Sequence, residues 1–309
     1  FSDKFLFILF SFLPVSLILG NFFINLTFIL ISLIFIIDLI MSKSLFFLKD
    51  TTFKLISLFL LSLLINVAFS IDPTNSLPRV LKILLMIMFV LQTQKIIKKY
   101  PLEFENIILS FWAIVFVIVL LDSVFEAIFG FNSLGFQTNM TGRIAGFFGS
   151  ELVAGSFLGG FAIMFISKVS LFFKNRNNLI IFLILFVIIT SFLIGERSNF
   201  IKLFFSLSLL TLFVVKLNFK NVSYSLLILF GTIFLFINFN EEIKYRYQNQ
   251  IIFANSKPLV SGQHETIEEF NKPFEMTIEN YIKDSLYGAH YNAAFKIFQE
   301  HPIFGIGVK

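Results

Sequence analysis

Residues 106–121 read N-I-I-L-S-F-W-A-I-V-F-V-I-V-L-L, a run with no charged side chain that is almost long enough to cross a bilayer as a helix. The rest of the chain has the same character. Of its 309 residues 57% are hydrophobic and 14% are charged, and its mean hydropathy is +0.88. A soluble domain cannot bury that much apolar surface. The sequence therefore predicts an all-α protein, a polytopic bundle of transmembrane helices.

Working outward from this run, the hydropathy pattern predicts about nine spans, several of them near the short end for crossing a bilayer. Gly20 and Asn21 separate the first two segments weakly, so these two could form one bent helix. The predicted spans are 5–19, 22–40, 53–69, 79–94, 106–121, 152–167, 179–194, 200–215 and 222–239.

The polar stretch after residue 239 predicts a different organisation. We expect residues 1–239 to form the bundle, 240–300 a long outer loop with an amphipathic helix over 277–300, and 301–309 the start of a further span. In the helix, Tyr291, Ala294, Phe295 and Phe298 fall on one face, which we expect to lie on the outer membrane surface.

The loop charges predict the orientation. Cytoplasmic loops are rich in Lys and Arg, and every second loop of this chain is richer in them than its neighbours. The N-terminus is therefore expected in the cytoplasm and residues 240–290 outside. The cations on the predicted cytoplasmic side are Lys4, Lys43, Lys49, Lys54, Lys95, Lys98, Lys99, Lys168, Lys174, Arg176, Lys216 and Lys220.

Arginine shows the opposite distribution. Arg79, Arg143 and Arg197 fall in short outer loops, and Arg246 falls in the long outer loop. A guanidinium group binds phosphate oxygens with two parallel hydrogen bonds and keeps its charge throughout. We therefore expect these side chains to converge on an anionic, diphosphate-bearing substrate at the outer face. The alternative is that they only reach for the membrane surface.

Two short motifs carry the best-placed arginines. Arg143 opens R-I-A-G-F-F-G-S-E-L-V-A-G-S (143–156), in which Glu151 either caps the following helix or orients Arg143. Arg197 lies in G-E-R-S-N (195–199), a link that places it at the mouth of the bundle. The alternative for this motif is a surface pair between Glu196 and Arg197.

A third motif contains histidine, a common general base near neutral pH. It reads G-A-H-Y-N-A-A-F-K-I-F-Q-E-H-P-I-F-G-I-G (288–307). His290 either faces a site or lies on a helix surface, whereas His301 fits a structural turn before Pro302. His264 lies in the polar loop without supporting context, and we expect it to be solvated.

Other chemistries find little support in the sequence. The chain has no cysteine and only three histidines, which are scattered and lack nearby acidic ligands. We therefore expect no metal and no cofactor. The G-I-G at 305–307 follows no strand, so it is not a dinucleotide fingerprint, and no basic patch indicates a nucleic-acid partner.

The three motifs, in this order and with a long outer loop before the third, resemble the O-antigen ligase and O-antigen polymerase family of bacterial envelope enzymes. The matching strings are R-I-A-G-F-F-G-S-E-L-V-A-G-S-F-L, G-E-R-S-N-F and H-Y-N-A-A-F-K-I-F-Q-E-H-P-I-F-G-I-G. The resemblance implies a multi-pass glycosyltransferase of the bacterial inner membrane, with its active site facing the periplasm.

The resemblance also implies the substrates and their binding residues. A ligase moves a glycan from undecaprenyl diphosphate to the lipid A core, and a polymerase moves it to a second lipid-linked glycan. The family's diphosphate-binding role falls on Arg197 and, less directly, on Arg143. Substrate contacts are then expected from Glu151, Arg79, His290 and Arg246. The family's His-Asn motif for acceptor activation is expected beyond residue 309. A lipid-linked glycan flippase is the alternative from another functional class.

Overall fold

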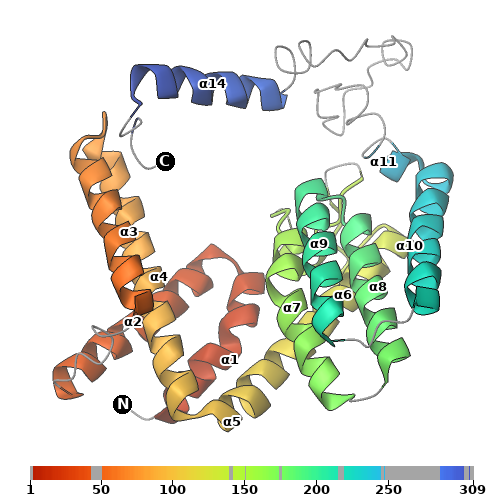
Figure 1. Cartoon of the computed structure of the whole chain (residues 1–309), viewed down its shortest axis with the longest axis horizontal. Helices are drawn as coiled ribbons and strands as arrows, with labels where there is room; N and C mark the ends of the chain where they lie inside the picture. Colours follow the sequence, from red (N-terminus) through yellow and green to blue (C-terminus); the bar gives the residue numbers. More distant parts are fainter. Residues whose placement is uncertain are drawn as a thin grey trace. The chain divides into compact units, whose positions relative to one another are not determined.

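The structure is a computed structural model, and it describes residues 3–42, 51–138, 142–149, 151–173, 176–214, 219–244, 247, 286–302 and 306 (Figure 1). Every regular element in these ranges is a helix, which confirms the predicted all-α class. Each predicted apolar segment also lies in a helix, with ends that differ by a few residues. The largest difference is the segment predicted as 106–121, whose helix continues to Phe129.

The chain divides into two compact units. Unit 1 comprises residues 1–108 and 279–309, and unit 2 comprises residues 109–278. Gly20, with a φ of +101°, ends the first helix of unit 1, and the second helix packs back against the first. The two are therefore separate helices and not one bent helix. The helices of unit 1 are α1 (Asp3–Leu19), α2 (Asn21–Ser42), α3 (Thr51–Ala68), α4 (Pro73–Lys99), α5 (Pro101–Glu103) and α14 (Leu286–Glu300), with a π-helical turn over Phe104–Ile108.

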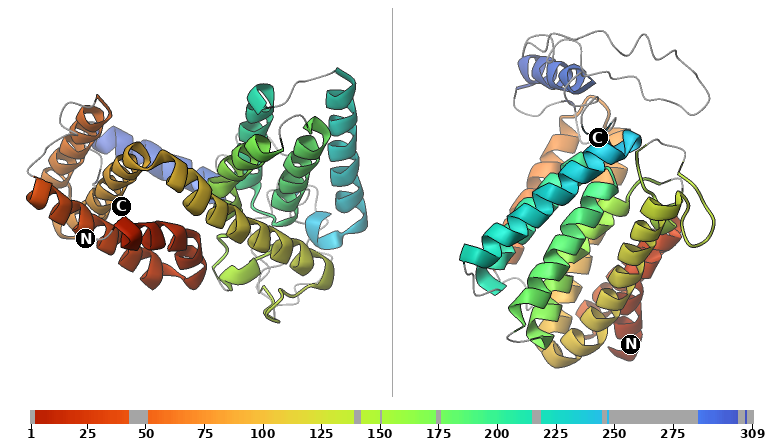
Figure 2. Two further views of the ribbon diagram at one scale, coloured as in Figure 1. Left: turned by 90° about the horizontal axis from the view of Figure 1, so that it is seen from below. Right: turned by 90° about the vertical axis from the view of Figure 1, so that its right-hand side faces the viewer.

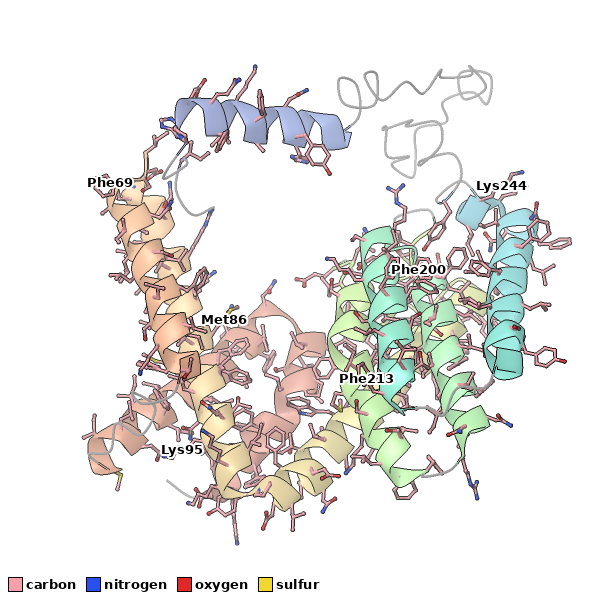
Figure 3. The ribbon with its side chains drawn as sticks, in the orientation of Figure 1. Phe69, Met86, Lys95, Phe200, Phe213 and Lys244 are labelled. Atoms are coloured by element: carbon pink, nitrogen blue, oxygen red, sulfur yellow. The ribbon has the colours of Figure 1, made fainter. Side chains whose placement is uncertain are left out.

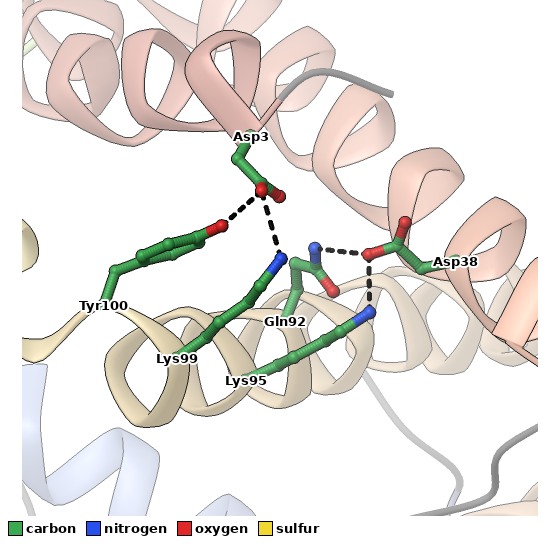
Figure 4. A network of polar contacts seen from close by, with 6 residues as sticks. All are labelled: Asp3, Asp38, Gln92, Lys95, Lys99 and Tyr100. Carbon is green, nitrogen blue, oxygen red and sulfur yellow. Dashed lines mark hydrogen bonds and ion pairs between the residues drawn. The ribbon is translucent and has the colours of Figure 1, made fainter.

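Two ion pairs join helices in unit 1 (Figure 4). Lys99 Nζ lies 3.0 Å from Asp3 Oδ2, so the end of α4 meets the start of α1. One turn earlier, Lys95 Nζ lies 2.7 Å from Asp38 Oδ2 near the end of α2, and Gln92 donates to the same oxygen. The two pairs join the start of α1, the end of α2 and the end of α4. The predicted order of spans places these three helix ends on the same side of the membrane.

Unit 2 is built around α7, which packs against α6, α8 and α9 (Figures 1 and 2). Small and aromatic side chains allow this central position: Ala154 and Ala162 are fully buried, and Phe165 stacks on Phe116 of α6 at a ring distance of 4.8 Å. The helices of unit 2 are α6 (Leu109–Phe129), α7 (Ala154–Phe172), α8 (Asn177–Leu193), α9 (Arg197–Val214), α10 (Phe219–Phe239) and α11 (Glu241–Lys244), with a 3-10 turn over Gly146–Phe148.

Four helices in the described part of the chain are long and apolar enough to cross a membrane. These helices expose large apolar side chains. Other parts of the molecule do so as well, since Phe69 is 63% and Phe213 is 81% exposed (Figure 3). Lipid accounts for such faces better than water does. The four helices are Asn21–Met41, Pro73–Lys99, Pro101–Phe129 and Ala154–Phe172, and shorter apolar helices are Phe53–Ala68, Asn177–Leu193 and Ser223–Phe239.

Helix α14 covers the described part of the predicted amphipathic helix. Tyr291, Phe295 and Phe298 are each more than 60% exposed, and they follow one another at helical spacing along one face. Residues 277–285, in which the helix was also expected, lie outside the described residues, as does most of the predicted outer loop.

Candidate functional site

The structure brings two of the three sequence motifs together within unit 2. The loop that carries Arg143 lies directly on the connection between α8 and α9. The amide of Ile144 donates to the carbonyl of Ile194 at 3.2 Å. Gly195, with a φ of +78°, lies so close to Gly142 that a Cβ at Gly195 would overlap the carbonyl oxygen of Gly142. The two backbones are therefore in direct contact.

Arg143 is held in place by an ion pair with Glu196. Its Nη2 lies 2.6 Å from Glu196 Oε1, and the same nitrogen donates to the carbonyl of Leu152 at 3.1 Å. The side chains of Arg143 and Glu196 are only 16% and 9% exposed. The interpretation of Glu196 as part of a surface pair is therefore wrong, because its carboxylate is buried and bound to Arg143.

Glu196 also connects the starts of α7 and α9. Asn199 donates to Glu196 Oε2 and, at 2.9 Å, to Ser156 Oγ on α7. Gly155 makes room for this arrangement, since a Cβ there would lie 2.9 Å from Glu196 Cβ. The carbonyl of Glu196 accepts the amide of Phe200, the first hydrogen bond of α9. One acidic residue thus caps a helix, neutralises Arg143 and contacts α7.

Arg197 is the first residue of α9 and is half-buried. It follows Glu196 directly, so its Cα lies about 3.8 Å from that of Glu196. The N-terminus of a helix carries partial positive charge, and α9 has no acidic residue in its first turn. Arg197 itself keeps a positive charge at this helix end.

Two carboxylates on α6 bind the loop between α6 and α7, which carries Arg143, and they were not predicted from the sequence. Glu126 on α6 accepts the amide of Gly146 at 2.6 Å through Oε2 and that of Ala145 at 3.3 Å through Oε1. Asp122, one turn earlier, accepts the amide of Ser133 at 2.9 Å. Both acids are only 4% exposed. They were missed because the predicted span ended at residue 121, which placed both in a solvated loop.

Asn132 completes this arrangement. It is 1% exposed, and its Nδ2 donates to the carbonyl of Gly146 at 2.7 Å. Its Oδ1 accepts the amides of Leu134 and Phe136, which closes the turn after α6. Gly146 is therefore bound through both its amide and its carbonyl. We call Asp122, Glu126 and Asn132 the loop brace.

The other predicted site residues occupy varied positions. Glu151 is exposed and does not cap α7, whose N-cap position is taken by Val153. Arg79 is exposed on the second turn of α4 in unit 1, so it lies in a helix and not in a loop. His290 is exposed on α14, also in unit 1. Arg246 lies outside the described residues.

Among the residues that the structure describes, no group of three or more His, Asp or Glu side chains is placed to hold a metal ion. Comparison of the chain with protein-family models, curated proteins and solved structures finds no match.

Proposed function

We propose that this protein is a membrane glycosyltransferase of the O-antigen ligase type. It takes a glycan from undecaprenyl diphosphate and transfers it to the lipid A core at the periplasmic face of the bacterial inner membrane. The observation that carries the proposal is the meeting of the Arg143 loop with the α8–α9 connection, 2.6 Å apart at the Arg143–Glu196 pair, with Arg197 as the next residue. A second lipid-linked glycan is the alternative acceptor, as in a polymerase.

The charges at this end of unit 2 assign different roles to the two arginines. Arg143 uses its guanidinium for Glu196 and Leu152, so its charge is already balanced. Arg197 lies at the N-terminus of α9, where the free backbone amides carry partial positive charge. A diphosphate at this position is stabilised by both the side chain and the helix end. Arg197 is therefore the diphosphate-binding residue, and Arg143 is a positioning residue.

The proposed reaction follows from this assignment. An acceptor hydroxyl attacks C1 of the glycan, the bond from C1 to the phosphate oxygen breaks, and undecaprenyl diphosphate leaves with the electron pair. The hydroxyl proton passes to a base. Negative charge develops on the leaving diphosphate, so a pre-placed guanidinium lowers the barrier; the loss of such a donor costs roughly 100- to 1,000-fold in rate.

A flippase remains the alternative from another class. Its supporting observation is the Asp38–Lys95 pair, which lies within two candidate spans of unit 1. Both residues, however, lie near the ends of their helices, and the pair joins α2 to α4. Transfer of glycan in detergent micelles, where no sealed compartment exists, separates the two functions, since a flippase catalyses none.

The test is a transfer assay on purified protein in detergent with a lipid-linked glycan donor. Arg197→Ala is expected to lose roughly 100-fold or more in kcat. Arg197→Lys is expected to recover only part of it, because an ammonium group cannot bind the diphosphate with a planar fork. Arg176→Ala is the matched control, since Arg176 is an exposed arginine at the opposite end of α8. Equal activity of all four proteins contradicts the assignment of Arg197.

A further inference from the structure

One member of the loop brace, the buried Glu126 on α6, binds the loop that carries Arg143. Glu126 binds the amides of Ala145 and Gly146, and these two residues follow Arg143 by two and three positions. Both bonds go to a carboxylate, and charge-assisted hydrogen bonds are stronger than neutral ones. Since Glu126 is 4% exposed, water does not compete for them. The backbone of the loop is therefore fixed just beyond Arg143.

The same loop is also fixed by the α8–α9 connection, which contacts the residues on both sides of Arg143. The amide of Ile144 is bound by the carbonyl of Ile194, and Gly142 is in contact with Gly195. Arg143 thus lies between two anchored segments, and its side chain reaches Glu196. The Glu126 anchor belongs to α6, whereas the Glu196 anchor belongs to the start of α9.

From these contacts we propose that Glu126 is a positioning residue. It holds the loop so that the Arg143 side chain binds Glu196, an arrangement that we call the seating of Arg143. The role rests on the proposed function only in its effect on transfer, because the seating itself is a property of the fold. Without the carboxylate, two amides lose their acceptor in a buried place, and the loop shifts to find water or another partner. Arg143 then leaves Glu196, and a carboxylate without its counter-ion directly precedes Arg197, where it repels an incoming diphosphate.

The first test measures the seating without reference to activity. Glu126→Gln keeps the size of the side chain, but one acceptor oxygen becomes an NH2 donor and the remaining carbonyl oxygen is uncharged, so one bond is lost and the other is weakened. In the variant, hydrogen exchange of a peptide covering residues 142–149 should accelerate about tenfold or more, as expected for the loss of a charge-assisted bond. Phenylglyoxal should modify Arg143 faster than in the wild type, whereas the rate at the exposed Arg176 should stay the same.

Glu103→Gln is the matched control, because Glu103 is an exposed glutamate at the other end of the same continuous helix, Pro101–Phe129. Its exchange and its modification rates should equal those of the wild type. If Glu126→Gln matches this control in both measurements, the positioning role is contradicted.

The second test joins the seating to transfer. If Glu126 acts through Arg143 and Glu196 on the leaving diphosphate, kcat should fall about tenfold while KM for the donor lipid changes less than about twofold. An unchanged kcat in a variant whose Arg143 reacts faster overturns the catalytic part of the proposal. A wild-type protein without transfer activity contradicts the proposed function instead, and the exchange and modification rates still decide on the seating.

Discussion

Units 1 and 2 are both helical, but they use their charged side chains differently. In unit 1, the Asp3–Lys99 and Asp38–Lys95 pairs join one helix to another, and these side chains are 23–54% exposed (Figure 4). In unit 2, Glu196 is 9% exposed and joins a loop to two helices. The partly solvated pairs fasten helices, whereas the buried acid fixes a loop conformation. The buried arrangement therefore carries the larger desolvation cost.

The largest expected effect comes from breaking the buried pair. Glu196→Ala leaves the Arg143 guanidinium buried without its carboxylate, which should cost about 4 kcal/mol of unfolding free energy. Asp38→Ala removes a pair that is partly solvated, and its cost should be about 1 kcal/mol. Denaturant unfolding in one detergent measures both. Similar losses in the two variants would remove the distinction between the units.

A smaller effect is expected where the two backbones of the site touch. Gly195 and Gly130 have nearly the same φ, +78° and +77°, but a Cβ at Gly130 has nothing within 4 Å. Gly130→Ala should therefore cost only the conformational strain, about 1 kcal/mol. Gly195→Ala adds the overlap with Gly142, for a total of about 3 kcal/mol. Unfolding curves of the two variants that coincide would contradict the close backbone contact.

The contact between Glu196 and α7 can be tested with two glycine variants of α7, whose effects on stability should differ. Gly155→Ala places a methyl group against Glu196 and should cost about 2 kcal/mol. Gly159→Ala, one turn along the same helix, meets open space and should be neutral or stabilising by up to about 1 kcal/mol, because alanine favours the helix. The melting temperature of Gly155→Ala should lie below the wild-type value, and that of Gly159→Ala should lie at or above it. Destabilisation by both would show that the whole helix face is intolerant.

The smallest effect concerns unit 1 and depends on pH. A hydrogen bond from Tyr100, followed by the contact with Lys99, holds the pKa of Asp3 below its usual value. A lowered pKa means that the contribution to stability is present above the unfolded pKa of about 4 and is lost as the pH falls through the folded value.

Asp3→Asn should therefore be less stable than the wild type by about 0.5 kcal/mol above pH 4, since solvent screens a side chain that is 46% exposed. The difference should shrink below pH 4 and disappear as the pH falls through the lower pKa of the folded state. Unfolding free energies measured at pH 3 and pH 7 provide the check, and a difference that grows in acid would contradict the assigned sign.

The helices could be predicted because apolar runs bounded by polar loops determine them. The ends of those helices were less predictable. Asp122 and Glu126 ended the predicted span, although they lie on a helix that continues to Phe129. A carboxylate that binds loop amides has no hydropathy signal of its own, and only the spacing of the two acids, one helical turn apart, could have indicated a shared face.

The candidate site was predictable in part for a similar reason. Arg143 and Arg197 were predicted at the same end of the bundle, in loops on one side of the membrane, and the two motifs that carry them do meet in unit 2. The pairing of Arg143 with Glu196 could not be predicted, because the two residues lie 53 positions apart in the sequence. Long-range pairing depends on which loops the packed helices bring together, and a single sequence carries little information on that.

Direct binding of undecaprenyl diphosphate tests the central claim, that the start of α9 is a diphosphate site. With purified protein in detergent, Arg197→Ala should raise the Kd about tenfold or more, as expected for losing a charged hydrogen bond, and Arg176→Ala should change it less than about twofold. Undecaprenol, which lacks the diphosphate, should bind all three proteins equally. An Arg197→Ala protein that binds the diphosphate lipid as tightly as the wild type would contradict the account.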